Sequence, residues 1–196
     1  MRAKLDYKYF ISFSKDNEHF YSLGKADVEA HVLNVLKYFK KDPKKMRVLE
    51  IGCGAGRLVK HMAQIFGEVY GVDISEEMIR RAKEYCKNED NVFLYVNSGK
   101  DLSMFPDEFF DFIFSYITFQ HIPEKWIIVN YVKEAHRILR KGGIFKFQVQ
   151  RYLGEEYLKT KKNSWLGASF SKREIEEIAK STGFEIVDMK GEESKC

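Results

Sequence analysis

Short apolar runs alternate with longer helical patterns from residue 46 onward. The runs are rich in Val, Ile, Phe and Tyr, the residues that strands favour. Strands that alternate with helices predict a parallel sheet covered by helices on both faces. The five predicted strands are 46–51, 68–73, 91–96, 109–116 and 143–150.

Helical patterns fill the intervals between these strands. In the segment 57–66 the apolar residues fall near one face of a helix. Ser75 is suited to cap the next helix, and Pro123 suits the first turn of a helix that runs to about Leu139. A further helix is predicted over 25–40, before the first strand.

The C-terminal part of the chain predicts a last helix and a sixth strand. Ser171 and Glu174 have the spacing of a capping box, and Gly183 is suited to end the helix. The following segment, 184–190, has the composition of a strand, and only the polar residues 191–196 come after it.

Charge and aromatic content narrow the class of protein only slightly. The 33 Lys and Arg residues against 29 Asp and Glu give a formal net charge of +4, which is too mild to indicate a nucleic-acid partner. We interpret the basic runs near 37–47 and 159–162 as solvated loops or helix ends. Aromatic residues make up 15% of the chain, and they either fill a core or wall a pocket.

The number and spacing of the cysteines, and the length of the apolar stretches, indicate where in the cell the protein resides. Cys53, Cys86 and Cys196 are odd in number, far apart and without a CxxC pair, which argues against a disulfide framework or a metal site. The charged N-terminus lacks the apolar region of a signal peptide, and no stretch is long enough to span a membrane. We therefore expect a cytoplasmic protein with no metal and no membrane partner.

The strongest chemical signal is VLEIGCGAGRL, in which a strand leads through three glycines into a helix. Gly52 and Gly54 allow a tight turn and close backbone approach to a ligand, and Gly56 allows the helix to pack on the strand. A dinucleotide fingerprint reads G-x-G-x-x-G, whereas Arg57 stands in the third glycine position here. Glu50 would repel a phosphate and attract an amino group, so a dehydrogenase is disfavoured.

Asp73 closes the second predicted strand, about 20 residues beyond the glycine turn. A carboxylate at that place can accept hydrogen bonds from both hydroxyls of a ribose. The alternative interpretation is an acid that caps a helix or faces solvent.

The motifs VLEIGCGAG, VYGVDIS, FDFIFSY and LRKGG stand in the order found in class I S-adenosylmethionine-dependent methyltransferases, and the chain resembles this family over 46–190. The resemblance implies an α/β fold, a three-layer sandwich with a mostly parallel central sheet, and S-adenosylmethionine as cofactor. We expect a single domain over 1–196, with a lid and helix in 1–45 and a Rossmann-like core in 46–190.

The family's sheet usually has a seventh, antiparallel strand between strands five and six. Because only 191–196 follow the predicted sixth strand, we expect the seventh strand to be absent, leaving six strands and an abnormal edge or gap beside 145–149. A truncated sequence, a second chain that completes the sheet, or a shifted sixth strand would each explain the gap, and we favour truncation.

The resemblance also implies the residues that hold the cofactor. Relatives often carry an acid after the third strand that reaches the adenine amino group, and Ser98 replaces it here. Asp101, or backbone groups beside it, would take over that contact. The acid and glycines of the first motif would surround the methionine part, and residues after the second strand would contact ribose and adenine. The expected cofactor-binding set is Glu50, Gly52, Gly54, Gly56, Asp73, Ile74, Met78, Lys100, Asp101, Leu102 and Ser115.

The segment SYITFQHIPEKW follows the fourth predicted strand, where the methyl acceptor would bind. Histidine is the usual general base of proteins near neutral pH, so His121 could serve as one, while Tyr116 and Gln120 could orient a polar substrate. His121 could equally cap the following helix or bond a neighbouring loop. Methyl transfer needs alignment and exclusion of water more than a fixed catalytic residue. We interpret Cys53 as a small packed residue rather than a nucleophile.

The aromatic segment 6–24 is a candidate lid over the cofactor. Its residues Tyr9, Phe13, Phe20 and Tyr21 would cover the cofactor or contact the substrate, or would simply anchor the N-terminal helix.

The function that we predict is methyl transfer to a small-molecule acceptor. The alternative is a non-catalytic protein that binds S-adenosylmethionine, or a partner subunit. A nucleic-acid methyltransferase is disfavoured, because the sequence has neither an Asn/Asp-Pro-Pro-Tyr/Phe signature nor a Pro-Cys pair. Neither the acceptor nor the oligomeric state follows from the sequence.

Overall fold

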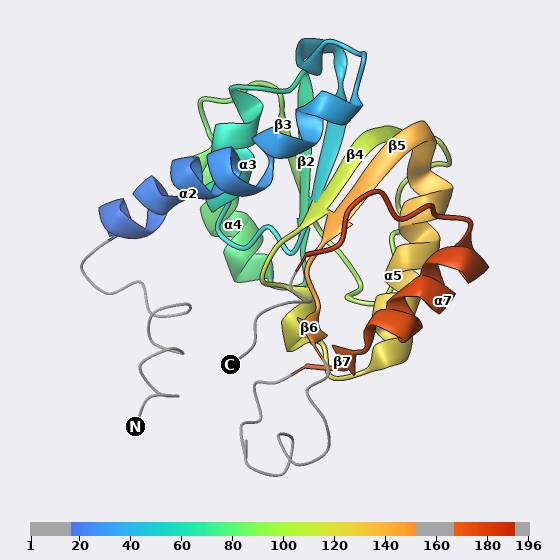
Figure 1. Cartoon of the computed structure of the whole chain (residues 1–196). Coiled ribbons are helices and arrows are strands. Elements are labelled where there is room, and N and C mark those ends of the chain that lie inside the picture. Colours follow the sequence, from blue (N-terminus) through green and yellow to red (C-terminus); the bar gives the residue numbers. More distant parts are fainter. Residues whose placement is uncertain (1–16, 152–166, 191–196) are drawn as a thin grey trace.

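The computed structural model describes residues 17–151 and 167–190, and its centre is a parallel five-stranded sheet in the order β3-β2-β1-β4-β5 (Figure 1). Each neighbouring pair of strands is parallel, so the carboxyl ends of all five strands share one edge. The predicted α/β fold with a parallel central sheet is therefore confirmed. The strands are β1 (Arg47–Ile51), β2 (Glu68–Asp73), β3 (Val92–Val96), β4 (Phe110–Ser115) and β5 (Leu139–Phe147).

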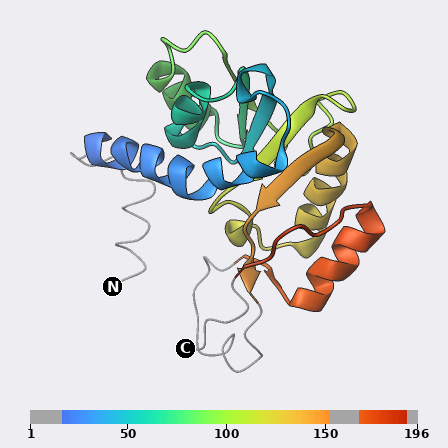
Figure 2. The same ribbon diagram turned by 45° about the horizontal axis from the view of Figure 1, so that its top comes forward.

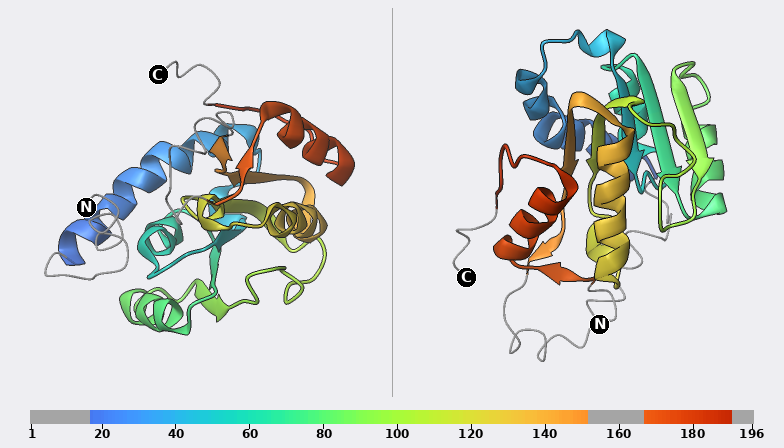
Figure 3. Two further views of the ribbon diagram at one scale, coloured as in Figure 1. Left: turned by 90° about the horizontal axis from the view of Figure 1, so that it is seen from below. Right: turned by 90° about the vertical axis from the view of Figure 1, so that its right-hand side faces the viewer.

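Helices cover both faces of this sheet, and Figures 2 and 3 show α2 lying along α3 and α7 lying beside α5. One face carries α2 (Asn17–His31), α3 (Arg57–Ala63) and α4 (Glu76–Tyr85), and the other carries α5 (Lys125–Ile138) and α7 (Lys172–Thr182). The short elements are the 3₁₀ helices η1 (Leu33–Tyr38), η2 (Pro43–Lys45) and η3 (Phe119–His121), and a parallel pair of β6 (Gln150–Arg151) and β7 (Ser169–Phe170).

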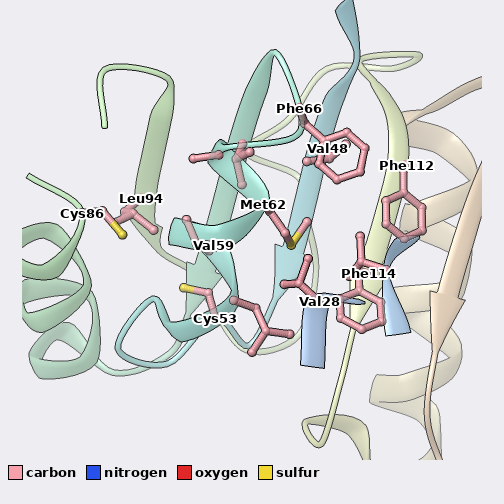
Figure 4. Packing of buried hydrophobic residues seen from close by; sticks show 14 of the residues in the cluster. Val28, Val48, Cys53, Val59, Met62, Phe66, Cys86, Leu94, Phe112 and Phe114 are labelled. Atoms are coloured by element: carbon pink, nitrogen blue, oxygen red, sulfur yellow. The ribbon is translucent and has the colours of Figure 1, made fainter. Parts of the chain in front are cut away.

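Successive residues of the central strands are buried on opposite faces of the sheet. Val48 of β1 belongs to the cluster of α2, α3 and α4 residues, among them Val28 and Met62 (Figure 4). Its neighbour Leu49 belongs to the other cluster, with Ile128 of α5. Burial on both faces is the reason that the strands of a parallel sheet are almost continuously apolar. The aromatic residues around 105–112 fill these cores, and the Phe110 ring centroid lies 5.0 Å from those of Phe105 and Phe109.

Asp111 fixes the edge of the sheet opposite the strand carboxyl ends. Its carboxylate accepts hydrogen bonds from Lys41 Nζ (2.8 Å), the Arg47 N–H (2.8 Å) and Arg140 Nη1 (2.9 Å). Burial alone would raise the pKa of Asp111, but these donors and cations hold it below its usual value. One carboxylate thus joins the segment before β1 to the starts of β1, β4 and β5.

Several local predictions are confirmed. The Ser75 side chain caps α4 by accepting from the Met78 N–H. The Ser171 and Glu174 capping box is present at α7, and Gly183 ends that helix with a φ of +87°. These predictions succeed because each depends on residues only a few positions apart.

The predicted bounds of two helices and one strand were wrong. The N-terminal helix, expected over 25–40, spans Asn17–His31 and is followed by η1. Lys146 Nζ donates to the His31 carbonyl at 2.6 Å, which satisfies a helix-end carbonyl from a distant strand. The helix expected over 57–66 ends at Ala63. The strand β5 begins at Leu139 rather than at residue 143, because a bulge lets Leu139 pair with Phe110.

The predicted sixth strand was also wrong, since 184–190 forms no ladder and the main sheet has five strands within the described residues. The Phe184 ring packs on His136 (5.2 Å between centroids) and on Phe145 (6.3 Å). These contacts hold the segment against side chains of α5 and β5 instead of against the β5 backbone. Ile186 and Val187 are both exposed, so the segment lacks the alternation of a half-buried strand. Among the described residues, β5 is an edge strand.

The closeness of α2 to α3 generates a stability prediction at Gly24. A Cβ at this position would lie 2.3 Å from the Arg57 carbonyl oxygen. Gly24→Ala should therefore destabilise the protein by roughly 1–3 kcal/mol, although a helical glycine-to-alanine change is ordinarily stabilising. Denaturant unfolding measures the change, with the exposed Glu29→Ala on the same helix as control. Unchanged or increased stability of Gly24→Ala would contradict the described packing.

Candidate active site

The turn after β1 is held against the end of β2. The N–H groups of Gly52 and Cys53 both donate to the Val72 carbonyl, at 2.8 and 3.0 Å. Gly52, Gly54 and Gly56 have φ values of +77°, +52° and +82°, a region that L side chains rarely adopt. The glycines are therefore required by the backbone path of the turn.

The three glycines face different surroundings. A Cβ on Gly52 would lie 2.2 Å from Thr118 Oγ1, and one on Gly56 would lie 3.1 Å from the Ala82 Cβ of α4. A Cβ on Gly54 would meet nothing within 4 Å. Gly52 and Gly56 thus permit contacts inside the protein, whereas Gly54 presents backbone to open space, as a cradle for a ligand does.

Asp73 joins the glycine turn to the start of α4. One carboxylate oxygen accepts from the Gly54 N–H at 2.9 Å, and the other accepts from the Ser75 N–H at 2.9 Å. Each oxygen of a carboxylate has a second lone pair. Asp73 can therefore hold the turn and still accept hydrogen bonds from a vicinal diol.

Glu50, on β1, is only 2% exposed. Its Oε2 atom is buried and has no hydrogen-bond partner among the described residues. Burial raises the pKa of this carboxyl to about 8; the Arg57 guanidinium opposes the rise, and the Asp73 carboxylate adds to it. An orphaned buried acceptor is unfavourable, and a ligand that supplies an N–H or ammonium donor would relieve it.

Helix α2 adds a charged pair to this side of the site. Arg57, the first residue of α3, forms an ion pair with Asp27 of α2. The Arg57 guanidinium also lies 5.3 Å from the centre of the Phe20 ring. Sequence reasoning missed this pair, because nothing in the pattern of α2 distinguishes Asp27 from a solvated surface acid.

Of the aromatic residues of the candidate lid, Tyr9 and Phe13 lie outside the described residues. Tyr21 stacks on Tyr85 of α4, with 3.8 Å between ring centroids. Phe20 packs edge-on against Tyr21. For Phe20 and Tyr21, these contacts support the interpretation that they anchor the N-terminal helix.

The end of β4 carries two residues with different surroundings. Ser115 is buried, and its hydroxyl donates to the Ile51 carbonyl at 3.1 Å, so its side chain joins β4 to β1. The Tyr116 ring stacks on Phe114 and lies 4.5 Å from the His31 ring of α2. Burial raises the pKa of Tyr116, so its hydroxyl remains protonated near neutral pH.

The loop after Tyr116 is strained and tightly packed. Ile117 has a φ of +57°, which is unusual for a β-branched residue and typical of loops held by their surroundings. His121 ends η3 with its side chain exposed, and its Nε2 lies 3.4 Å from the side-chain nitrogen of Gln120. The Gly167 N–H donates to the Gln120 carbonyl at 2.7 Å. The loop is thus braced by the segment that leads into β7.

On the other side of Asp73, an apolar side chain stands out into solvent. Ile74 is 69% exposed, and its side chain would lie 2.8 Å from a Cβ on Gly99. Met78, one turn into α4, is half-buried. An exposed isoleucine directly after an anchored carboxylate is suited to contact the flat face of a base.

The loop 98–103 is ordered by its own hydrogen bonds. The Asp101 carboxylate accepts from the Ser98 hydroxyl and from Ser103, and the Lys100 N–H donates to Ser98 Oγ. Leu102 is fully buried, so its side chain belongs to the core. The structure therefore brings the glycine turn, Glu50 and Asp73 together, whereas the Leu102 side chain lies in the core and the Ser115 hydroxyl is bonded to Ile51.

Cys53 and Cys86 are free, buried thiols. Burial raises the pKa of Cys53 well above its usual value and that of Cys86 to about 12, so neither is a ready nucleophile. Within 17–151 and 167–190, no group of three His, Cys, Asp or Glu side chains is placed to hold a metal. No helix in those ranges is long and apolar enough to cross a membrane.

Comparison with known proteins identifies the family. A family model described as a methyltransferase domain matches residues 49–147. An uncharacterised protein of Methanocaldococcus jannaschii is 33% identical over 191 residues, which cover 92% of this chain and 80% of that protein. The range matched by the family model includes the glycine turn, Asp73 and the loop after β4.

Solved structures agree with this assignment. A protein from Pyrococcus horikoshii superposes with a TM-score of 0.68 at 27% identity, over 90% of this chain and 88% of its own. Phosphoethanolamine N-methyltransferase 2 of Haemonchus contortus, solved with phosphomonomethylethanolamine and S-adenosylhomocysteine, gives a TM-score of 0.62 at 29% identity, over 77% of this chain and 36% of its own.

The chain spans about a third to a half of the length of most curated relatives that carry an enzyme name, from 30% to 45%. The family model nevertheless covers the glycine turn, and the solved structures share the fold that places the turn at the strand ends. The chain belongs to the class I S-adenosylmethionine-dependent methyltransferases.

Proposed function

We propose that this chain transfers the methyl group of S-adenosylmethionine to a small-molecule acceptor. The observation that carries the proposal is the orphaned, buried Oε2 of Glu50, which comes four residues before Gly54 and its open backbone face. This pair offers an acceptor for an amino group and a backbone cradle next to it. A dinucleotide would place its pyrophosphate at this turn, next to the acidic Glu50 side chain. A dinucleotide therefore fits this site poorly.

The proposed cofactor site follows the strand ends. Glu50 would accept a hydrogen bond from the amino group of the methionine part, above the three glycines of the turn. Asp73 would accept from the ribose hydroxyls, and Ile74 and Met78 would contact ribose or adenine. Asp101, or the backbone of Lys100 and Leu102, would reach the adenine amino group. Because the Ser115 hydroxyl is already bonded to Ile51, Ser115 would contribute main-chain groups only.

The proposed acceptor end lies after β4. When bound, the cofactor supplies an activated methyl group, and the protein must align the acceptor with it and exclude water. Tyr116, with its hydroxyl protonated, would donate to a polar acceptor, and Gln120 would help to orient it. His121 would take the acceptor's proton where the acceptor needs to lose one.

Relatives support a small acceptor, since their names include a 2-methyl-6-phytyl-1,4-hydroquinone methyltransferase and a 27-O-demethylrifamycin SV methyltransferase. We also propose one methyltransferase domain, with 1–45 as its N-terminal lid and helix and 46–190 as its core. The free thiols of Cys53 and Cys86 support a reducing, cytoplasmic location.

The first test concerns the cofactor. S-adenosylhomocysteine should bind in calorimetry and NAD should not. Asp73→Ala should weaken binding by roughly 1.5–3 kcal/mol, the range for a hydrogen bond to a charged group. The exposed Glu76→Ala on α4 is the control, and circular dichroism checks that both variants fold. Equal affinity of Asp73→Ala and the unaltered protein would reject the assignment of Asp73.

The second test concerns the acceptor end. Once an acceptor has been found by screening with labelled methyl donor, His121→Ala should lower turnover by about a hundredfold or more and leave cofactor affinity nearly unchanged. His136→Ala, on α5, is the matched control. Full turnover in His121→Ala would assign His121 a structural role. Cofactor binding without transfer to any acceptor would instead favour a non-catalytic binding protein.

A further inference from the structure

Among the described residues, the groups around Glu50 include more acids than cations, so a bound cation would balance the charge. The charges of Arg57 and of Asp73 on β2 act on Glu50 of β1, and Asp27 of α2 is bound to that same Arg57. In the described ranges, the cation that acts on Glu50 is the Arg57 guanidinium, which is already paired with Asp27. The Asp73 charge is stabilised by two backbone N–H groups. Within the described part of the chain, Glu50 therefore shares its counter-charge with Asp27.

The remaining groups around Glu50 do little to stabilise its charge. A backbone hydrogen bond at Val59 of α3 favours the charged form. The thiols of Cys53 and Cys86 interact with Glu50 only as neutral groups, because burial raises the pKa of both well above neutrality. Buried and with Oε2 unpartnered among the described residues, Glu50 is a neutral acid at pH 7, since its pKa is about 8.

We propose that the amino group of the cofactor binds Glu50 as an ammonium ion and that Glu50 releases its proton to solvent when it does so. This inference rests on the proposed function, because it concerns the same cofactor site. The O–H bond of the carboxyl breaks, the proton passes to the buffer, and the ammonium keeps its own protons. The buried carboxylate then has an unshared cation, which residues 17–151 and 167–190 do not provide.

Proton release has two consequences that ordinary hydrogen bonding lacks. Cofactor affinity falls as pH drops below about 8, because the proton must leave before the pair forms. The number of protons released is also specific to ligands that carry the ammonium group. A ligand that fills only the nucleoside part of the site should bind without releasing a proton.

The test is titration calorimetry at about pH 6.5 in several buffers of different ionisation enthalpy, with S-adenosylhomocysteine as the probe. The slope of observed enthalpy against buffer enthalpy gives the number of protons released, which should be close to one. The matched ligand control is 5′-methylthioadenosine, which lacks the amino-acid part and should release none. Glu50→Gln, which imitates the neutral acid, should release none and bind S-adenosylhomocysteine about tenfold or more weakly.

The outcomes separate this inference from the proposed function. Binding of S-adenosylhomocysteine without proton release, or with the same release in Glu50→Gln, overturns the inference and leaves the cofactor site intact. Failure of S-adenosylhomocysteine to bind the folded, unaltered protein overturns the proposed function itself. One proton for S-adenosylhomocysteine, and none for the control ligand or variant, supports the inference.

A ligand-free measurement provides a second readout. The carboxyl of Glu50 has a pKa of about 8 in the folded protein against an ordinary value of 4.5. Its ionisation therefore costs stability progressively as pH rises from 4.5 to 8, and the full cost applies above 8. In thermal denaturation, Glu50→Gln should gain stability over the unaltered protein as pH is raised through this window. The same difference in melting temperature at pH 5 and pH 9 would contradict the inference.

Discussion

The site depends above all on the Asp73 carboxylate, which accepts the Gly54 N–H with one oxygen and the Ser75 N–H with the other. These two bonds join the end of β2, the turn after β1 and the first turn of α4. They fix the open backbone of Gly54 beside the second strand and leave Ile74 exposed next to it. Without this carboxylate the Gly54 and Ser75 N–H groups would lose their acceptor, while Gly52 and Cys53 would still bond to the Val72 carbonyl.

The two edges of the sheet differ: ion pairs and hydrogen bonds fix the edge opposite the strand carboxyl ends, and the carboxyl edge carries the acids of the site. The opposite edge of the sheet is tied together by Asp111 and its donors, and both faces of the strands are buried under helices. The carboxyl edge carries Glu50, whose burial is unfavourable to folding. Natural proteins tolerate such local conflicts mainly where a ligand resolves them. The orphaned acid is thus best explained by the cofactor that we propose for this site.

The parts of this site that could be predicted from the sequence are those specified by neighbours in the chain. The glycine spacing, the acid at the end of β2 and the Ser171 capping box each follow from a few adjacent residues and a fixed geometry. The parts that could not be predicted depend on distant partners. Asp27 meets Arg57 from 30 residues away, and α2 ends where Lys146, 115 residues later, reaches the His31 carbonyl. The segment 184–190 has the composition of a strand, but Phe184 packs on side chains of α5 and β5, a preference that composition does not reveal.

The most direct test of the account is a crystal structure of the chain with S-adenosylhomocysteine. We expect the amino group of the ligand within hydrogen-bonding distance of Glu50, its amino-acid part over Gly54, and its ribose hydroxyls on Asp73. The glycine turn itself should move little, because its N–H groups are already held by Val72 and Asp73. A ligand bound elsewhere, or with its amino group turned away from Glu50 and its ribose away from Asp73, would contradict the account.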